Sequence, residues 1–350
     1  MKRNLWPRRL AIPGIVLAAT GALLGSSALP SLSGLPGLAG REHAPRGLNI
    51  LLMGTDERDT LTAKQKQKFH AGGKPCGCSD VMMLIHVSAH RDRVSVIGMP
   101  RDSYAEIPPY RAKPGARERP PHPAKLNAAY QEGGPELMIR TVESMAKLNI
   151  DRFLQVDFRR FMNSVDEVGG VEVCTPRRLK DSATRLDLKP GKHRLGGGQA
   201  LQYVRSRHVD GSADLGRIQR QQRFLVQAWR EVRERKLLTH PRRMTHLVEM
   251  LLGSKRQGFS AGELVELAAA LHRLPDSATE FTTVPIAGFA PARLGIGAAL
   301  AWDPKEADTL FTNVRDDRPL LERGADPKPK DPPDILGKPV PVRGSTYACH

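Results

Sequence analysis

Three short apolar runs in the first third of the chain predict strands of a buried sheet. The first covers residues 48–53 and ends at Gly54, the second covers 81–87, and the third covers 94–99 and ends at Pro100. A continuous apolar run of this length between turn residues is typical of a strand that is covered on both faces. Because only a short polar turn separates the second run from the third, these two strands are expected to form a hairpin.

Helical patterns dominate the rest of the chain. The clearest begins at Gly216, where Ile218, Leu225, Trp229 and Val232 fall on one stripe of a helix. This mixture of strands and long helices predicts a layered α/β domain over residues 47–320. Helices are predicted over 135–148, 157–168, 216–238 and 261–274, and further short strands over 171–174 and 284–286.

The N-terminal segment predicts the compartment. Four Lys and Arg residues lie within 1–9, and no charge follows before Gly40. The densest apolar part, 10–29, is long enough to cross a bilayer, and positive charge before it places the N-terminus inside the cell. We therefore predict a cytoplasmic tail, a signal anchor at 10–29 and a linker at 30–46. A cleaved signal peptide is the alternative, because small residues at 26–28 suit cleavage. Both place the domain outside the cytoplasm.

The charge of the chain indicates an anionic partner. Lys and Arg number 54 against 37 Asp and Glu, a formal net charge of +17. Nucleic acid, an anionic membrane surface and a phosphorylated substrate are the three classes of partner that such an excess favours. A domain outside the cytoplasm makes nucleic acid a poor choice and removes ATP as the expected substrate.

Two carboxylates flank the first two predicted strands. Asp56 follows the first strand and Asp80 begins the second. If these strands are antiparallel, both carboxylates meet at one rim of the sheet, where α/β proteins place ligands. Two carboxylates make a sparse oxygen site that suits Mg²⁺, which keeps several waters and also takes phosphate oxygens. The alternative is that both are turn or cap residues. Arg101 follows the third strand, and Asp102 is placed to orient it.

Basic residues between 205 and 221 form the strongest local signal. Arg205 and Arg207 alternate in a segment predicted to be extended. Arg217, Arg220 and Gln221 lie at i, i+3 and i+4 in the first turns of the helix predicted from 216, where an anion is favoured. Together they predict a cradle for a dianion or pyrophosphate. The alternative is a solvated basic face, because more arginines follow on the same helix.

The four cysteines fit an oxidising compartment but are too few for a disulfide framework. Cys76 and Cys78 flank one glycine, Cys174 ends a predicted strand, and Cys349 is next to last. Our hypothesis is that one of the first two bonds Cys174 and the other bonds Cys349. This would tie down residues 321–350, which are rich in proline and otherwise predicted to be a mobile tail. Zinc binding is the rival reading, which export and the wide spacing disfavour.

Seven segments in a fixed order resemble the LytR-CpsA-Psr family of bacterial cell-wall phosphotransferases. The resemblance covers about residues 47–235, with weaker support to about 320. It implies a three-layer α/β/α domain with a central mixed sheet, preceded by one transmembrane helix, and an apolar groove for a polyprenyl chain. The segments are 49–56, 79–83, 100–102, 125–130, 165–171, 199–207 and 214–222.

The resemblance also implies an activity and a location. Such proteins are single-pass proteins of the cell membrane with the catalytic domain outside. With Mg²⁺ they transfer a glycan phosphate from polyprenyl pyrophosphate to a peptidoglycan sugar hydroxyl, attaching a teichoic acid, capsule or arabinogalactan type of polymer. Phosphoryl transfer needs charge neutralisation and alignment more than a special nucleophile, which agrees with the residues above. The implied partners are the lipid-linked glycopolymer, peptidoglycan and the membrane, with no nucleic acid.

Site residues carry over position by position. Asp56 and Asp80 would hold Mg²⁺, and Asp102 would act as a base or orient an arginine. One departure is Cys78, which stands where the family often has Arg, so that Arg58 or Lys74 would have to supply the missing contact. The residues that would hold the pyrophosphate are Arg101, Arg205, Arg207, Arg217 and Gln221, with Arg58 and Arg220 as weaker candidates.

Two alternative functions are also compatible with the sequence. A non-catalytic protein with the same fold would bind polyprenyl pyrophosphate or a wall polymer without turnover. A transcriptional attenuator would bind DNA, but the sequence shows no helix-turn-helix or zinc-finger pattern.

Overall fold

The computed structural model describes residues 47–57, 61–72, 77–253 and 258–349. The predicted cytoplasmic tail, anchor and linker of residues 1–46 lie outside this part of the chain and stay predictions, as does the position of Arg58. None of the described helices is long and apolar enough to cross a membrane.

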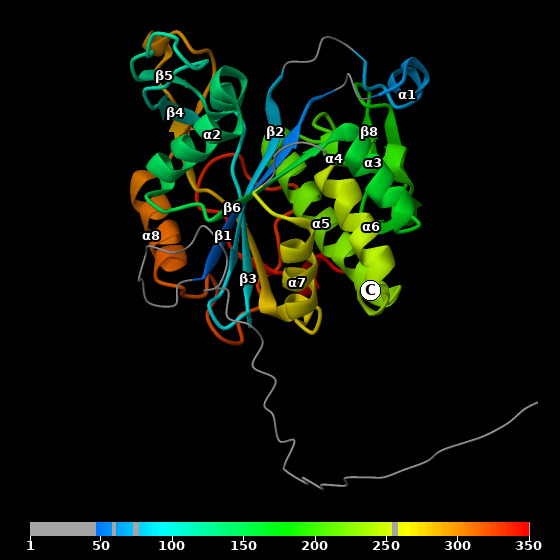
Figure 1. The fold of residues 1–350 in the computed structure, drawn as a ribbon. Coiled ribbons are helices and arrows are strands. Elements are labelled where there is room, and N and C mark those ends of the chain that lie inside the picture. The colour runs from blue at the N-terminus through cyan, green and yellow to red at the C-terminus, as the bar shows by residue number, and fades with distance from the viewer. Residues whose placement is uncertain (1–46, 58–60, 73–76, 254–257, 350) are drawn as a thin grey trace, which may run out of the picture. The chain divides into compact units, whose positions relative to one another are not determined.

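A six-stranded mixed sheet lies at the centre of the described domain (Figure 1), in the order β14-β11-β3-β2-β1-β6. β2 runs antiparallel to both β1 and β3, so the predicted hairpin is confirmed, whereas β6 pairs parallel with β1 and β11 with β3. The three apolar runs are the central strands, which are covered on both faces. The strands are β1 (Leu48–Thr55), β2 (Ser79–Val87), β3 (Val94–Gly98), β6 (Arg152–Asp157), β11 (Thr279–Thr283) and β14 (Val342–Arg343).

Helices cover both faces of this sheet, as Figure 1 shows for α2 and α8 on one side and α3 to α7 on the other. Successive strand side chains point to opposite faces. Leu51 therefore packs in a cluster with residues of α2 and α8, while Ile50 packs with residues of α3 to α6. The helices are α2 (Leu126–Ala146), α3 (Phe158–Glu167), α4 (Gly197–Arg205), α5 (Ala213–Glu234), α6 (Pro241–Leu252), α7 (Ala261–Leu271) and α8 (Pro304–Arg315).

Several short helices and four two-stranded sheets lie outside the central sheet in the described part of the chain. The helix α1 (Ala63–Lys68) precedes β2, and short 3-10 helices lie at Leu237–Thr239, Asp276–Ala278, Ala292–Leu294 and Gly344–Tyr347. The two-stranded pairs are β4 (Tyr104–Ile107) with β5 (His122–Lys125), β7 (Val171–Thr175) with β10 (Gly191–Leu195), β8 (Leu179–Asp181) with β9 (Leu186–Leu188), and β12 (Ile286–Phe289) with β13 (Leu300–Trp302).

Two helices begin earlier than their apolar patterns predicted. α2 starts at Leu126, and the non-helical backbone of Gly133 and Gly134 interrupts it. α5 starts at Ala213, after the N-cap residue Ser212. The two glycines divide α2, and the predicted start at residue 135 is the first residue after them. The ends of a helix are located less reliably by its apolar spacing than its middle.

Two strand assignments were wrong. Arg205 is the last residue of helix α4, and Arg207 lies in the turn that follows, so the segment around them is not a strand. The predicted strand 284–286 is divided, because β11 ends at Thr283 and β12 begins at Ile286.

The C-terminal tail is packed, which corrects the expectation of a mobile tail. Val342 is buried in β14, which pairs with β11 at the edge of the sheet. On α5, Gln219 donates a hydrogen bond to the Lys330 carbonyl (2.8 Å) and Gln227 donates one to the Tyr347 carbonyl (2.8 Å). Proline-rich composition predicts the absence of a helix, but side chains can still bind the free carbonyls of such a segment.

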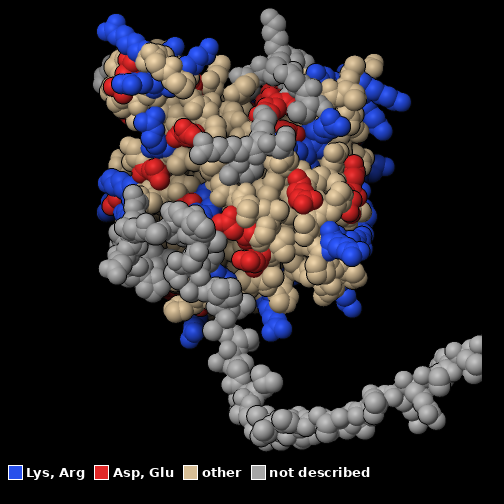
Figure 2. All heavy atoms as spheres, viewed as in Figure 1, with Lys and Arg blue, Asp and Glu red and all other residues tan. Residues whose placement is uncertain are grey.

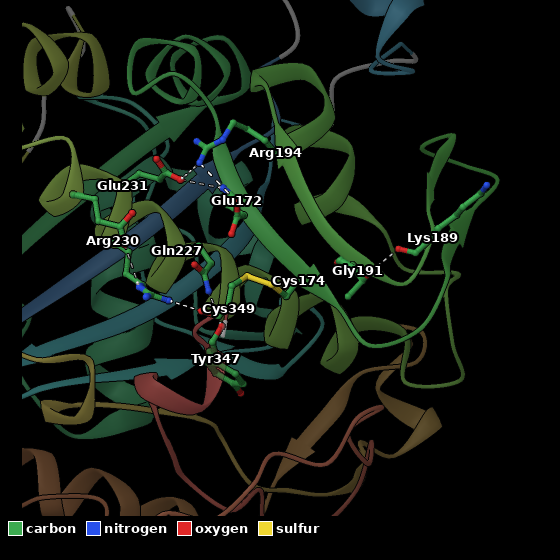
Figure 3. The surroundings of a disulfide bond; sticks show 12 residues. Glu172, Cys174, Lys189, Gly191, Arg194, Gln227, Arg230, Glu231, Tyr347 and Cys349 are labelled. Carbon is green, nitrogen blue, oxygen red and sulfur yellow. Dashed lines mark hydrogen bonds and ion pairs between the residues drawn. A yellow bond between two sulfur atoms is a disulfide. The ribbon is translucent and has the colours of Figure 1, made fainter.

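A disulfide bond fastens the end of this tail (Figure 3). Cys174 in β7 is bonded to Cys349, with the Cα atoms 5.6 Å apart. The predicted pairing of Cys174 and Cys349 with Cys76 and Cys78 is therefore wrong. Cys78 is itself in a disulfide bond. The reason is topological, since β7 and the tail both pack against α5, which brings residues 175 positions apart into contact.

Replacing Cys174 and Cys349 together by serine should lower the free energy of unfolding by about 2–5 kcal/mol, because the bond closes a long loop. Chemical denaturation of the oxidised protein and of the double variant measures this difference. After reduction, which also breaks the disulfide bond of Cys78, the wild-type protein and the double variant should have the same midpoint. Equal midpoints of the two oxidised proteins would contradict the expectation.

Candidate functional site

An apolar cavity of about 590 Å³ lies between the sheet and the helices α3, α5 and α6. Leu154 and Met83 line it from the sheet, Phe161 from α3, Ala228 from α5 and Leu247 from α6. This volume lies within the range of small-molecule sites, which are mostly apolar with a few polar groups at defined places. The cavity agrees with the apolar groove that the resemblance implied.

Charged side chains line one end of this cavity. They come from the start of β2, the end of β3, the end of α4 and the second and third turns of α5. Most of the predicted pyrophosphate residues are therefore brought together. The polar members of the lining that had been predicted are Asp80, Arg101, Arg205, Arg207, Arg217 and Gln221.

The two predicted carboxylates lie at the same rim of the sheet, but only Asp80 is among the residues that line the cavity. β1 and β2 are antiparallel, and the Asp56 amide donates a hydrogen bond to the Cys78 carbonyl (3.1 Å). Asp56 is buried, and Asp80 forms an ion pair with Arg101. Within the described ranges, no group of three or more His, Cys, Asp or Glu side chains is placed to hold a metal ion. A metal at this rim would therefore depend on two carboxylates and on ligands from a substrate.

Three arginines converge on one carboxylate, Asp214. Its Oδ1 forms an ion pair with Arg207, and its Oδ2 lies 3.3 Å from Nη2 of Arg217 and 4.0 Å from Nε of Arg101. The Nε atoms of these three arginines are buried and have no hydrogen-bond partner among the described residues. Asp214 was not among the predicted site residues, because the helix was expected to begin only at Gly216, whereas α5 begins at Ala213 and places Asp214 three residues before Arg217 on the same helix.

Arg217 is the most deeply buried of the three arginines, at 3% exposure. Burial lowers the pKa of Arg217 to about 10; Asp214 counteracts this, and the nearby Arg207 adds to it. Desolvated cations in this arrangement would be stabilised by an added anion. Figure 2 shows further basic side chains on the surface, mainly around the edge of the face in view.

Three other predicted residues occupy the rim in different ways. Arg205 lies over the ring of Phe158, at 4.8 Å from its centroid, and lines the cavity. Gln221 also lines it and donates a hydrogen bond to the Val204 carbonyl (3.0 Å). Asp102 does not line the cavity, but its Oδ1 lies 3.4 Å from Nζ of Lys125.

Arg220 is not brought to the cavity. Its guanidinium donates a hydrogen bond to the Ser206 carbonyl (2.6 Å) and pairs with Asp210 (3.4 Å). Because α5 starts at Ala213 and not at Gly216, the three predicted residues of this helix lie three positions further from its N-terminus than was predicted. Arg220 therefore stabilises the junction of α4 and α5.

Asp214→Asn should lower the free energy of unfolding by about 3–5 kcal/mol, because it leaves the buried Arg217 without its carboxylate. Asp308→Asn is the matched control, since Asp308 pairs with Lys147 on the surface, where such pairs contribute about 0–1 kcal/mol. Urea denaturation of both variants measures the difference. Equal effects of the two substitutions would contradict the expectation.

Comparison with known proteins supports the resemblance. The chain is 31% identical over 309 residues to the probable cell wall biosynthesis protein LcpB of Corynebacterium glutamicum, covering 86% of this chain and 69% of that protein. It is 32% identical over 190 residues to the polyisoprenyl-teichoic acid–peptidoglycan teichoic acid transferase TagU of Oceanobacillus iheyensis, covering 53% of this chain and 51% of that protein.

Solved structures show the same fold. Protein gbs0355 from Streptococcus agalactiae aligns with a TM-score of 0.63 and 20% identity, over 87% of this chain and 94% of its own. The LytR-CPS2A-psr family protein YwtF (TagT), solved with bound octaprenyl pyrophosphate lipid, aligns with a TM-score of 0.53 and 20% identity, over 79% and 93%. The model of the LytR_cpsA_psr family matches residues 36–310 of the chain, which therefore belongs to the LytR_cpsA_psr family.

Proposed function

We propose that this protein transfers a glycan phosphate from a polyprenyl pyrophosphate to a sugar hydroxyl of peptidoglycan, and so attaches a secondary wall polymer. The observation that carries the proposal is an apolar cavity whose end is lined by Arg101, Arg207 and Arg217. An amphipathic lipid pyrophosphate matches both parts of this site. The relatives support the proposal, since TagU is a teichoic acid transferase and TagT was solved with octaprenyl pyrophosphate.

The side chains of this site have separate tasks. The cavity holds the polyprenyl chain and keeps water from its end. Arg101, Arg207 and Arg217 neutralise the diphosphate, so that the bond from the bridging oxygen to the glycan-bearing phosphorus can break as the acceptor oxygen bonds to that phosphorus. Polyprenyl phosphate is the leaving group, and its newly freed oxygen can take up the proton that the acceptor hydroxyl loses. We assign Asp102 the role of orienting Arg101 and Lys125, between which it lies.

Asp56 and Asp80 fit a magnesium site that takes few protein ligands. Mg²⁺ is commonly bound by one or two carboxylates together with substrate phosphates. When bound, it would neutralise charge on the diphosphate. A diphosphate that takes over Arg101 would release the Asp80 carboxylate for this purpose.

We also propose that the domain acts outside the cytoplasm, anchored through residues 10–29. The Cys174–Cys349 disulfide supports this location, because such bonds persist mainly in oxidising compartments. The acceptor and the lipid-linked donor both meet at the membrane surface in that arrangement.

The test uses the full chain in detergent with a polyprenyl-pyrophosphate-linked glycan and peptidoglycan oligomers, and measures released polyprenyl phosphate. Turnover should require Mg²⁺, and Arg101→Ala should lower it at least about a hundredfold, because one cation of the transition-state cradle is lost. Arg178→Ala, at an exposed ion pair with Asp187, is the control and should retain full activity.

Binding of the donor without release of polyprenyl phosphate would reject the transferase and favour a non-catalytic binding protein of the same fold. Loss of activity in Arg178→Ala equal to that in Arg101→Ala would reject the assigned site.

Filling the cavity should weaken binding of the lipid but not of its head group. In Ala228→Phe the larger ring occupies space that the polyprenyl chain would take, so the affinity for farnesyl pyrophosphate should fall about tenfold or more. Affinity for inorganic pyrophosphate should not change. Ala228→Ser keeps the volume and is the control, and calorimetry measures all four affinities. Equal loss for both ligands would show that the cavity does not hold the chain.

A further inference from the structure

A buried carboxylate lies beside the arginine cluster without belonging to it. Asp181 ends β8 and is 1% exposed. Its Oδ1 accepts hydrogen bonds from the amides of Ala183 (2.8 Å) and Thr184 (3.0 Å). Its Oδ2 accepts hydrogen bonds from the amides of Arg207 (2.6 Å) and His208 (2.8 Å). Each oxygen thus binds a different segment of the chain.

The two bonds at Oδ1 have an ordinary explanation. An Asp side chain often binds amides two and three residues further along the chain and so forms a turn, here between β8 and β9. The two bonds at Oδ2 are not local, because they span 26 and 27 residues. The Asp181 carboxylate therefore does more than form the turn of its own hairpin.

The turn that receives these bonds carries Arg207. Helix α4 ends at Arg205, and residues 206–208 belong to no helix or strand. Amides outside helices and strands need partners other than those of regular structure, and Asp181 provides one for two successive amides. A second bond ties the same elements together, since Gln202 donates to the Thr184 carbonyl (2.8 Å). The hairpin, the end of α4 and the turn are thereby joined.

The environment of Asp181 keeps its carboxyl group ionised, so that it can accept these hydrogen bonds. Burial raises the pKa of Asp181, but the backbone amides at His208, Thr184, Arg207 and Ala183 lower it by more, so the pKa lies below its usual range. The carboxyl is therefore ionised at neutral pH and accepts all four hydrogen bonds. Among the described residues, no Lys or Arg side chain pairs with Asp181, and Nδ1 of His208 lies 3.8 Å away.

We propose that Asp181 is a positioning residue for the pyrophosphate head group, acting through the backbone of Arg207. It fixes where the chain leaves α4, and this sets the point from which the Arg207 side chain reaches the mouth of the cavity and Asp214. The inference rests on the proposed function, because it assigns Asp181 to the binding of the same ligand.

The test compares two aspartates of one hairpin. Asp181→Asn replaces one carboxylate oxygen by an NH₂ group. This group cannot accept hydrogen bonds from backbone amides, so one of the two pairs of hydrogen bonds is lost. Asp187→Asn is the matched control, because Asp187 lies in β9 and pairs with the exposed Arg178. Calorimetry with farnesyl pyrophosphate should show about tenfold weaker binding for Asp181→Asn and no change for Asp187→Asn. Binding of farnesol, which lacks the head group, should be equal in all three proteins.

A double-mutant cycle separates positioning from general stability. Asp181→Asn should cause no further loss of affinity in a protein that already carries Arg207→Ala, since Asp181 is proposed to act on the head group only through the Arg207 side chain, which is then absent. Additive losses, or wild-type affinity in Asp181→Asn, would overturn the inference.

Hydrogen exchange on the unaltered protein gives a measurement that needs no variant. The amides of Arg207 and His208 should exchange slowly before any ligand is added, and exchange at the rate of free amides would overturn the inference even if Asp181→Asn fails to fold. Wild-type protein that does not bind farnesyl pyrophosphate at all would reject the proposed function as well, so the two failures can be told apart.

Discussion

The structure depends on holding three arginines together at the end of an apolar cavity. Arg101, Arg207 and Arg217 come from three parts of the chain, and each repels the others. Asp80 and Asp214 compensate part of this charge in the ligand-free protein. Cations in such a site are stabilised by an anion of matching geometry, and an apolar cavity beside them selects an anion with an apolar tail.

Helix α5 is the element that connects this site to the rest of the fold. One face carries Arg217, Gln221 and Ala228 to the cavity. Another face binds the tail, through Gln219 to Lys330 and Gln227 to Tyr347. The disulfide at Cys349 then closes the tail on β7, as Figure 3 shows. The proline-rich tail thus supports the helix from the side that faces away from the ligand.

The central strands, the position of two carboxylates and the family could be predicted from the sequence. The three apolar runs predicted the central strands, and the hairpin followed from the short turn between them. The position of Asp56 and Asp80 at the same rim required only that the first two strands be antiparallel. The order of seven motifs predicted the family, which the match over 36–310 shows. These features depend on local pattern or on order along the chain, which a sequence displays directly.

Other features could not be predicted because they depend on contacts between distant segments. Asp214 and Arg217 share a helix, but Arg101 and Arg207 reach the same carboxylate only after folding. Arg220 is an arginine on the same helix as Arg217, three residues further along. Its side chain nevertheless pairs with Asp210 and does not line the cavity. The pairing of Cys174 with Cys349 followed from the packing of the tail on α5, which its proline content concealed. The sequence by itself determined which chemical groups the protein uses and the strands that carry them. Tertiary structure decided which of those groups share a site, because burial and direction are set by the packing of helices on the sheet.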